Sequence, residues 1–167
     1  MDTLMQGNQN SRCKSIVISK FTMDDKNIIE SYMQGPVWVI DVLPKQVPAN
    51  SKGQYFRIEK YYRNDSQVKP ILWKFINVLL KINCYEDIDV FHASEEWVSN
   101  PAPELLEKWI LERVPLYVLF PSWDMMIYVS DDDIYMTLYN RGEQSLDFIQ
   151  QIVTSEGLFL WKPEHDE

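Results

Sequence analysis

Four segments of the chain carry apolar side chains every three or four residues, which is the spacing of one buried face of an α-helix. They predict helices over 23–34, 69–82, 101–114 and 143–155. The segment 69–82 has the widest apolar face, and Pro70 stands in its first turn, so we expect it to be the central helix. Its apolar residues are Ile71, Leu72, Phe75, Ile76, Val78, Leu79 and Ile82.

Runs rich in β-branched and aromatic residues predict the strands. These runs are 15–19, 37–43, 53–62, 88–93, 116–120, 123–129, 134–140 and 158–161. We expect 37–43 and 53–62 to pair across the turn-rich segment between them, and 123–129 to form a hairpin with 134–140. Helices mixed with hairpins predict an α+β fold with a mostly antiparallel or mixed sheet and about four helices.

The length of the chain, 167 residues, is enough for one domain with its own core. We expect a single globular domain over 15–162, a flexible N-terminal segment over 1–14 and a C-terminal tail over 163–167. The first residues lack the basic start and apolar run of a secretory signal, and no apolar run approaches the roughly 20 residues that span a bilayer. These features predict a cytoplasmic protein that does not bind membranes, with Cys13 and Cys84 as thiols.

The net charge of −9 is concentrated in one part of the chain. Residues 82–140 contain twelve acidic residues and two basic ones, while the rest of the chain is close to neutral. Unpaired carboxylates repel one another and lower stability, so their concentration favours a cationic partner as the explanation. The same surface would repel nucleic acid, whose phosphates require Lys and Arg.

Two acidic clusters are interleaved with aromatic residues, one over 84–97 and one at the turn 131–133 of the predicted hairpin. Aromatic anchors among acids suit a protein interface, because Trp and Tyr bury area and charge steers the encounter. A turn between strands also favours Asp without any function, and that interpretation of the triplet stays open. The residues predicted to bind a partner are Glu86, Asp87, Asp89, Glu95, Glu96, Trp97, Asp124, Asp131, Asp132, Asp133 and Tyr135.

No catalytic or metal-binding pattern stands out in the sequence. The five glycines form no phosphate-binding loop, and there is no nucleophile elbow, Cys-x-x-Cys pair or His-Glu-x-x-His. His92 alternates with Val90 on a predicted strand, which favours a structural histidine. The spacing of Cys84, His92 and Glu95 matches no zinc pattern, and the Asp triplet lacks the glycine and late Glu of a calcium loop. We expect a protein without enzymatic activity, cofactor or metal.

In size, acidity, aromatic content and its closing segment "LDFIQQIVTSEGLFLW", the chain resembles the immunity proteins of bacterial toxin systems, including contact-dependent growth inhibition and Rhs-type systems. Such proteins bind a cognate toxin, frequently a basic nuclease, and have no enzymatic activity. The resemblance therefore implies a toxin inhibitor whose acidic and aromatic surface covers the basic active site of the toxin. These families share no functional residues, so the predicted site depends on charge and composition alone.

Three other functions stay open at this point, and one of them is a ligand-binding or sensor role. A non-catalytic cytosolic adaptor or assembly factor would use the same acidic and aromatic surface for a different partner. An enzyme that depends on a divalent cation would use the acidic residues as metal ligands.

Overall fold

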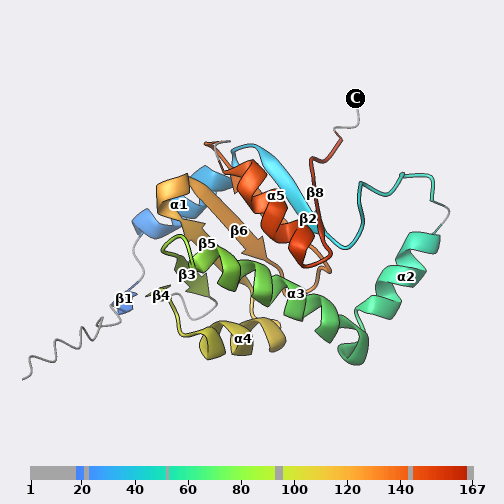
Figure 1. Cartoon of the computed structure of the whole chain (residues 1–167), viewed down its shortest axis with the longest axis horizontal. Coiled ribbons are helices and arrows are strands. Elements are labelled where there is room, and N and C mark those ends of the chain that lie inside the picture. Colours follow the sequence, from blue (N-terminus) through green and yellow to red (C-terminus); the bar gives the residue numbers. More distant parts are fainter. Residues whose placement is uncertain (1–17, 21–22, 52, 93–95, 143–144, 165–167) are drawn as a thin grey trace, which may run out of the picture.

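An eight-stranded antiparallel sheet forms the centre of the protein, and helices cover parts of both of its faces (Figure 1). The computed structural model describes residues 18–20, 23–51, 53–92, 96–142 and 145–164. Along the sheet the strands follow the order β1-β4-β3-β5-β6-β7-β2-β8. They comprise β1 (Ile18–Lys20), β2 (Val37–Asp41), β3 (Asp89–His92), β4 (Glu96–Ser99), β5 (Leu116–Phe120), β6 (Met125–Val129), β7 (Met136–Asn140) and β8 (Phe159–Trp161).

The described residues contain five α-helices and one short 3-10 helix. They are α1 (Met23–Met33), α2 (Gln54–Tyr62), α3 (Asp65–Asn83), α4 (Pro103–Leu111), α5 (Leu146–Ser155) and η1 (Pro121–Trp123). The predicted α+β fold with an antiparallel sheet is confirmed, although the helices number five rather than about four. The predicted N-terminal segment 1–14, with Cys13, lies outside the described residues, and Cys84 is a free thiol at the surface.

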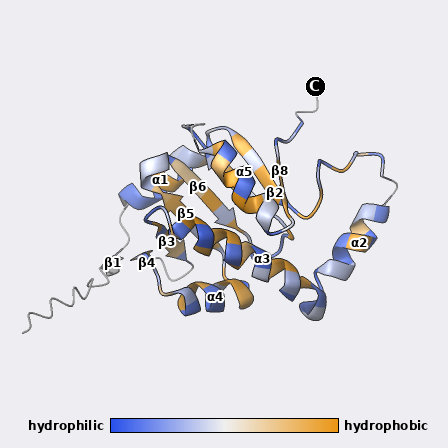
Figure 2. Ribbon diagram, viewed as in Figure 1, coloured by the Kyte–Doolittle hydropathy of each residue, from blue (hydrophilic) through white to orange (hydrophobic). Residues whose placement is uncertain are grey.

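Side chains alternate between the two faces of the sheet, and each face has its own core. Along β5, Leu116 and Val118 belong to the large core under α3, α4 and α5, whereas Tyr117 and Leu119 point to the opposite face. There α1 covers the middle of the sheet through Ile29. Hydrophobic residues concentrate on the sheet and on the helix sides turned towards it (Figure 2).

The long helix α3 is the central helix that the sequence predicted. All seven residues of the predicted apolar face are buried, and Phe75 is only 1% exposed. The helix begins at Asp65, earlier than predicted, so Pro70 lies in the second turn and not the first. Pro70 is exposed there, where its ring does not disturb the core.

The predicted hairpin is present as β6 and β7, which pair from Met125 opposite Asn140 to Val129 opposite Met136. β6 begins two residues later than predicted, because Trp123 belongs to η1. One strand escaped prediction: β4 pairs with both β3 and β1, in a segment that the sequence marked only as acidic.

The strand predicted over 53–62 is wrong, since this segment forms the helix α2. A hairpin with β2 is excluded, because β2 already pairs with β7 on one side and β8 on the other. The aromatic residues that favoured a strand lie on a helix with no buried residue. Figure 1 shows α2 projecting from the body of the sheet and helices, beside the start of α3.

In the part of the chain that the structure describes, no helix is long and apolar enough to cross a membrane.

Candidate partner-binding surface

The predicted acidic residues gather at two opposite ends of the sheet. Asp89 lies opposite Leu119 and next to the end of β5 where β6 begins, so residues 86–89 and Asp124 share one end. Leu116 lies opposite Val129, which places residues 131–133 at the other end. The five residues of β6 separate the two ends by roughly 13 Å along the strand. The two acidic clusters therefore lie at opposite ends of the strands.

At the first end, each carboxylate is engaged by a neighbouring polar side chain. Ser122 Oγ donates a hydrogen bond to Glu86, and Ser99 Oγ donates one to Asp89 at 2.5 Å. Asn100 Nδ2 donates to Asp87 Oδ1 at 2.9 Å. These bonds connect the end of α3, β4 and η1, so the carboxylates contribute to the fold.

Asp124, at the same end, forms an ion pair with Arg141. Arg141 Nη2 lies 2.5 Å from Asp124 Oδ1, and the guanidinium lies 3.8 Å from the centre of the Tyr32 ring. Burial raises the pKa of the Tyr32 hydroxyl, an effect that the nearby Arg141 opposes. Arg141, which follows β7, thus connects Asp124 to α1 and balances the charge of the Asp124 carboxylate.

At the second end, the protein binds the backbone of the acidic turn and leaves its carboxylates outside. The acidic turn consists of Ser130, Asp131, Asp132 and Asp133. Ser130 Oγ accepts hydrogen bonds from the N–H groups of Asp132 and Asp133. Arg113 donates to the carbonyl oxygens of Asp131, at 2.8 Å, and Asp133, at 3.1 Å. Burial lowers the pKa of Arg113, and the three carboxylates oppose that shift.

Asp131 and Asp132 of this turn are exposed and Asp133 is half-buried, so the turn offers carboxylates to a partner. The side chain of Asp132 is 73% exposed, and its Oδ1 lies 3.6 Å from Arg63 Nη1 at the end of α2. Exposed ion pairs at such distances contribute little stability. The contact nevertheless shows that the acidic turn and α2 are neighbours, although 69 residues separate Arg63 from Asp132 in the sequence.

The remaining predicted residues of the first cluster lie in or near β4. Trp97 is buried against the ring of Phe91, with 5.2 Å between the ring centres, so it is a core residue of the second face. Glu96 lies between Lys20 of β1 and His92 of β3, so it is inside the sheet and not at its edge. Glu95 lies outside the described residues.

His92 packs on Trp109 of α4, with 4.6 Å between the ring centres. Burial lowers the pKa of His92, and Glu96 opposes the shift. Among the described residues, no group of three or more His, Cys, Asp and Glu side chains is placed to hold a metal ion.

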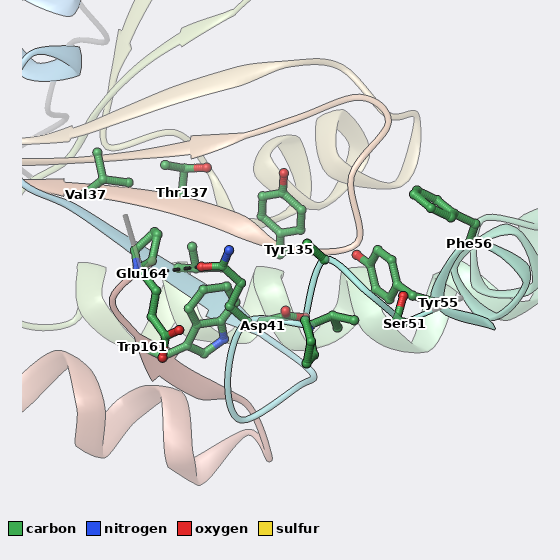
Figure 3. Close-up of a pocket in the computed structure, with 15 residues that line it drawn as sticks. Val37, Asp41, Ser51, Tyr55, Phe56, Tyr135, Thr137, Trp161 and Glu164 are labelled. Carbon is green, nitrogen blue, oxygen red and sulfur yellow. Dashed lines mark hydrogen bonds between the residues drawn. The ribbon is translucent and has the colours of Figure 1, made fainter. Parts of the chain in front are cut away.

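Tyr135, the last predicted residue, lines a pocket that the sequence did not predict. The pocket has a volume of about 510 Å³ and opens on the second sheet face, between β2, β7 and β8 and the segment that leads to α2. Figure 3 shows Val37, Thr137 and Tyr135 on the sheet side, and Asp41 between Trp161 and the segment that carries Ser51 and Tyr55. We name it the Asp41 pocket.

The chemistry of the Asp41 pocket is acidic and aromatic. Asp41 is 5% exposed, and burial raises the pKa of its carboxyl group, while the backbone N–H groups of Leu43 and Val42 oppose the shift. Burial also raises the pKa of Tyr55, which donates a hydrogen bond to Glu59. Glu59 pairs in turn with Arg63 at 2.5 Å. One chain of contacts therefore joins the pocket to α2 and the acidic turn.

Beside the pocket, α2 presents large apolar side chains to solvent. Phe56 lies on the side of the helix that lines the pocket and is the most exposed, at 69%, whereas Ile58, Tyr61 and Tyr62 lie on another side and form what we name the exposed face of α2. Exposed aromatic groups concentrated on one element are typical of protein-binding surfaces. The sequence held a signal for this helix, because Tyr55, Ile58 and Tyr62 follow one another at spacings of three and four residues.

The acidic turn, the Asp41 pocket and the exposed face of α2 together form the candidate site. Sequence reasoning identified the turn and Tyr135 but missed the other two parts. Asp41 offered one signal, since it is a single acid inside the apolar run "VWVIDVL". Comparison of the chain with models of protein families, with curated proteins and with solved structures finds no match.

Proposed function

We propose that this chain is an immunity protein that binds and neutralises a basic bacterial toxin, with a nuclease as the expected toxin class. The observation that carries the proposal is the contiguity of three features: an exposed aromatic helix, an acidic pocket and a turn whose carboxylates face solvent. Aromatic side chains supply anchors that exclude water, and carboxylates attract the Lys and Arg of a partner. This combination favours a basic protein as the ligand.

The inhibition follows from physical occlusion of the toxin. A nuclease binds the phosphates of its substrate through Lys and Arg, and a carboxylate can satisfy the same donors with charge-assisted hydrogen bonds. The acidic turn would take the place of substrate phosphates, while the exposed face of α2 packs on neighbouring apolar surface. No chemical step by the immunity protein is required.

Only some of the residues predicted from the sequence belong to the proposed interface. Asp131, Asp132, Asp133 and Tyr135 belong to the proposed interface, because they adjoin α2 and the Asp41 pocket. The acids at the other end of the sheet accept hydrogen bonds or an ion pair from their own neighbours, and we assign them to the fold.

The test is bacterial protection and co-purification with the toxin encoded beside this chain. The double variant Phe56→Ala/Tyr61→Ala should lose protection and weaken binding at least tenfold, since it removes two exposed anchors. The matched control is Tyr85→Ala, which removes an aromatic side chain that is equally exposed, at 69%, but lies at the end of α3. Equal losses in both variants would contradict the proposed interface. Binding without protection would favour the adaptor function instead.

A further inference from the structure

The carboxylate of Asp41 is buried without full hydrogen bonding. Its Oδ1 atom is inaccessible to solvent and has no hydrogen-bond partner among the described residues. A buried polar atom without a partner lowers stability, more so when it carries charge. Asp41 lies on the face of β2 that lines the pocket, together with Val37 and Val39. The unpaired oxygen is thus placed where a bound group could reach it after a small shift of the pocket wall.

The groups around Asp41 suit a cation. A second carboxylate, Glu164, also lines the pocket, and none of the lining residues that the structure describes is Lys, Arg or His. The rings of Tyr55, Tyr135 and Trp161 line the pocket as well. Aromatic faces attract cations, and Trp does so most strongly. An anion would meet two carboxylates here, and a neutral apolar group would leave Asp41 Oδ1 unpaired.

We propose that the Asp41 pocket binds an alkylammonium group, and that in the complex this group is the side chain of one lysine of the partner. A single unpaired oxygen matches an ammonium, which is a compact donor, better than the two-pronged fork of a guanidinium. The hydroxyl groups of Tyr135 and Thr137 can accept its other hydrogens. The apolar wall formed by Val37 and Val39 fits the methylene stem.

The pocket chemistry can be tested without any partner; only the source of the ammonium rests on the proposed function. Butylammonium is titrated into the full chain. The backbone amide signals and the indole N–H signal of Trp161 are followed by NMR. We expect saturable shifts confined to the pocket, with a dissociation constant on the order of 1 mM. The neutral isostere 1-butanol should produce no such shifts, and propylguanidinium should bind at least fivefold more weakly.

The variant Asp41→Asn should weaken butylammonium binding at least tenfold while leaving the rest of the spectrum unchanged. The comparison of butylammonium with 1-butanol uses the wild-type chain, so it tests the proposal even if the variant does not fold. Lys52 lies outside the described residues, and the titration is repeated with Lys52→Ala to exclude competition from this lysine. Equal shifts with 1-butanol, or shifts centred on the acidic turn, would overturn the proposal.

A second arm distinguishes a partner's lysine from a free amine. If a lysine occupies the pocket, butylammonium should compete with the toxin, and Asp41→Asn should weaken toxin binding. If neither butylammonium nor the Asp41→Asn substitution weakens toxin binding, the lysine assignment is overturned while the proposed function stays intact. Conversely, butylammonium binding by a chain that binds no toxin would support the pocket and contradict the proposed function.

Discussion

The two acidic ends of the sheet use the same residue type in opposite ways. At the end formed by residues 86–89 and Asp124, the side chains are bound and the carboxylates support the fold. At the acidic turn, Arg113 and Ser130 bind the backbone, and the carboxylates remain outside. A partner can reach an exposed and weakly paired carboxylate, such as that of Asp132, more easily than one already bound by hydrogen bonds within the fold. A sequence rich in acidic residues therefore shows where the charge lies. The hydrogen bonds of the folded protein decide whether that charge is available to a partner.

We expect the largest loss of stability from a change at Arg113, which binds the backbone of the acidic turn. Arg113→Ala removes both hydrogen bonds to the carbonyl groups of the acidic turn and should lower the free energy of unfolding by about 2 to 3 kcal/mol. Arg113→Lys is the matched control, because lysine keeps the positive charge but loses the planar fork of the guanidinium. Both variants keep a Cβ at this position, where φ is 59°. Urea denaturation measures both variants. If the lysine variant is as stable as wild type, the forked contact does not hold the turn.

Neutralising each acidic end in turn should give opposite results. Replacing Glu86, Asp87 and Asp89 by Gln, Asn and Asn should cost about 1 to 2 kcal/mol of stability, because three hydrogen bonds to charged acceptors become weaker. The matched triple change of Asp131, Asp132 and Asp133 to Asn should leave stability unchanged or slightly higher, since it relieves repulsion.

The association rate with the toxin should show the reverse pattern. The Asn triplet at 131–133 should slow association about tenfold at low salt, and the loss should shrink as salt rises, because the Debye length falls from about 10 Å at 0.1 M to about 3 Å at 1 M. Stopped-flow mixing at several salt concentrations measures it. Wild-type rates for both triple variants would contradict any role of the acidic residues in binding.

A smaller effect is expected at Asp41, and it depends on pH. Because burial raises its pKa in the folded chain, Asp41 stabilises the fold fully only below the pKa of the unfolded chain, and that contribution is lost as the pH rises through the folded value. Asp41→Asn should therefore be more stable than wild type at pH 7, by about 1 kcal/mol. The difference should disappear below about pH 4.

The groups that face Asp41 require a control for this measurement. They are Glu59 and Tyr55 on α2 and Tyr135 before β7, together with Glu164 in the lining of the pocket. Both tyrosines stay protonated below pH 8, so Glu59→Gln and Glu164→Gln are measured over the same range. A stability difference that stays constant from pH 3 to pH 7 would show that Asp41 is not the titrating group.

The smallest effect is expected at the exposed ion pair of the first end. Arg141→Ala removes the contact with Asp124 and should cost less than 1 kcal/mol, with the cost falling at high salt. Thermal unfolding at two salt concentrations measures it. A salt-independent loss above 2 kcal/mol would indicate that the packing of Arg141 on Tyr32, and not its charge, matters most.

Most elements with a buried face were predictable from the sequence, but the short buried strand β4 and the exposed helix α2 were not. α3 and the β6–β7 hairpin follow from periodicity, because burial on one side fixes the spacing of apolar residues. The segment of α2 was predicted as a strand because its aromatic residues are typical of a buried strand, although they lie on an exposed helix. Tyr135 was found through composition, but its pocket needs β2, β8 and α2, which the sequence does not place together.

The positions of β1 and β8 at the two edges of the sheet decide how the protein can be immobilised. Seven inter-strand spacings separate these edge strands, which is roughly 34 Å. The C-terminal edge borders the Asp41 pocket, and the N–H of Glu164 donates a hydrogen bond to Gln46 Oε1 within the lining. An affinity tag or surface linker placed directly after Glu164 would therefore begin at the rim of the pocket. One placed directly before Ile18 would begin at the opposite edge and keep the candidate site open to a partner.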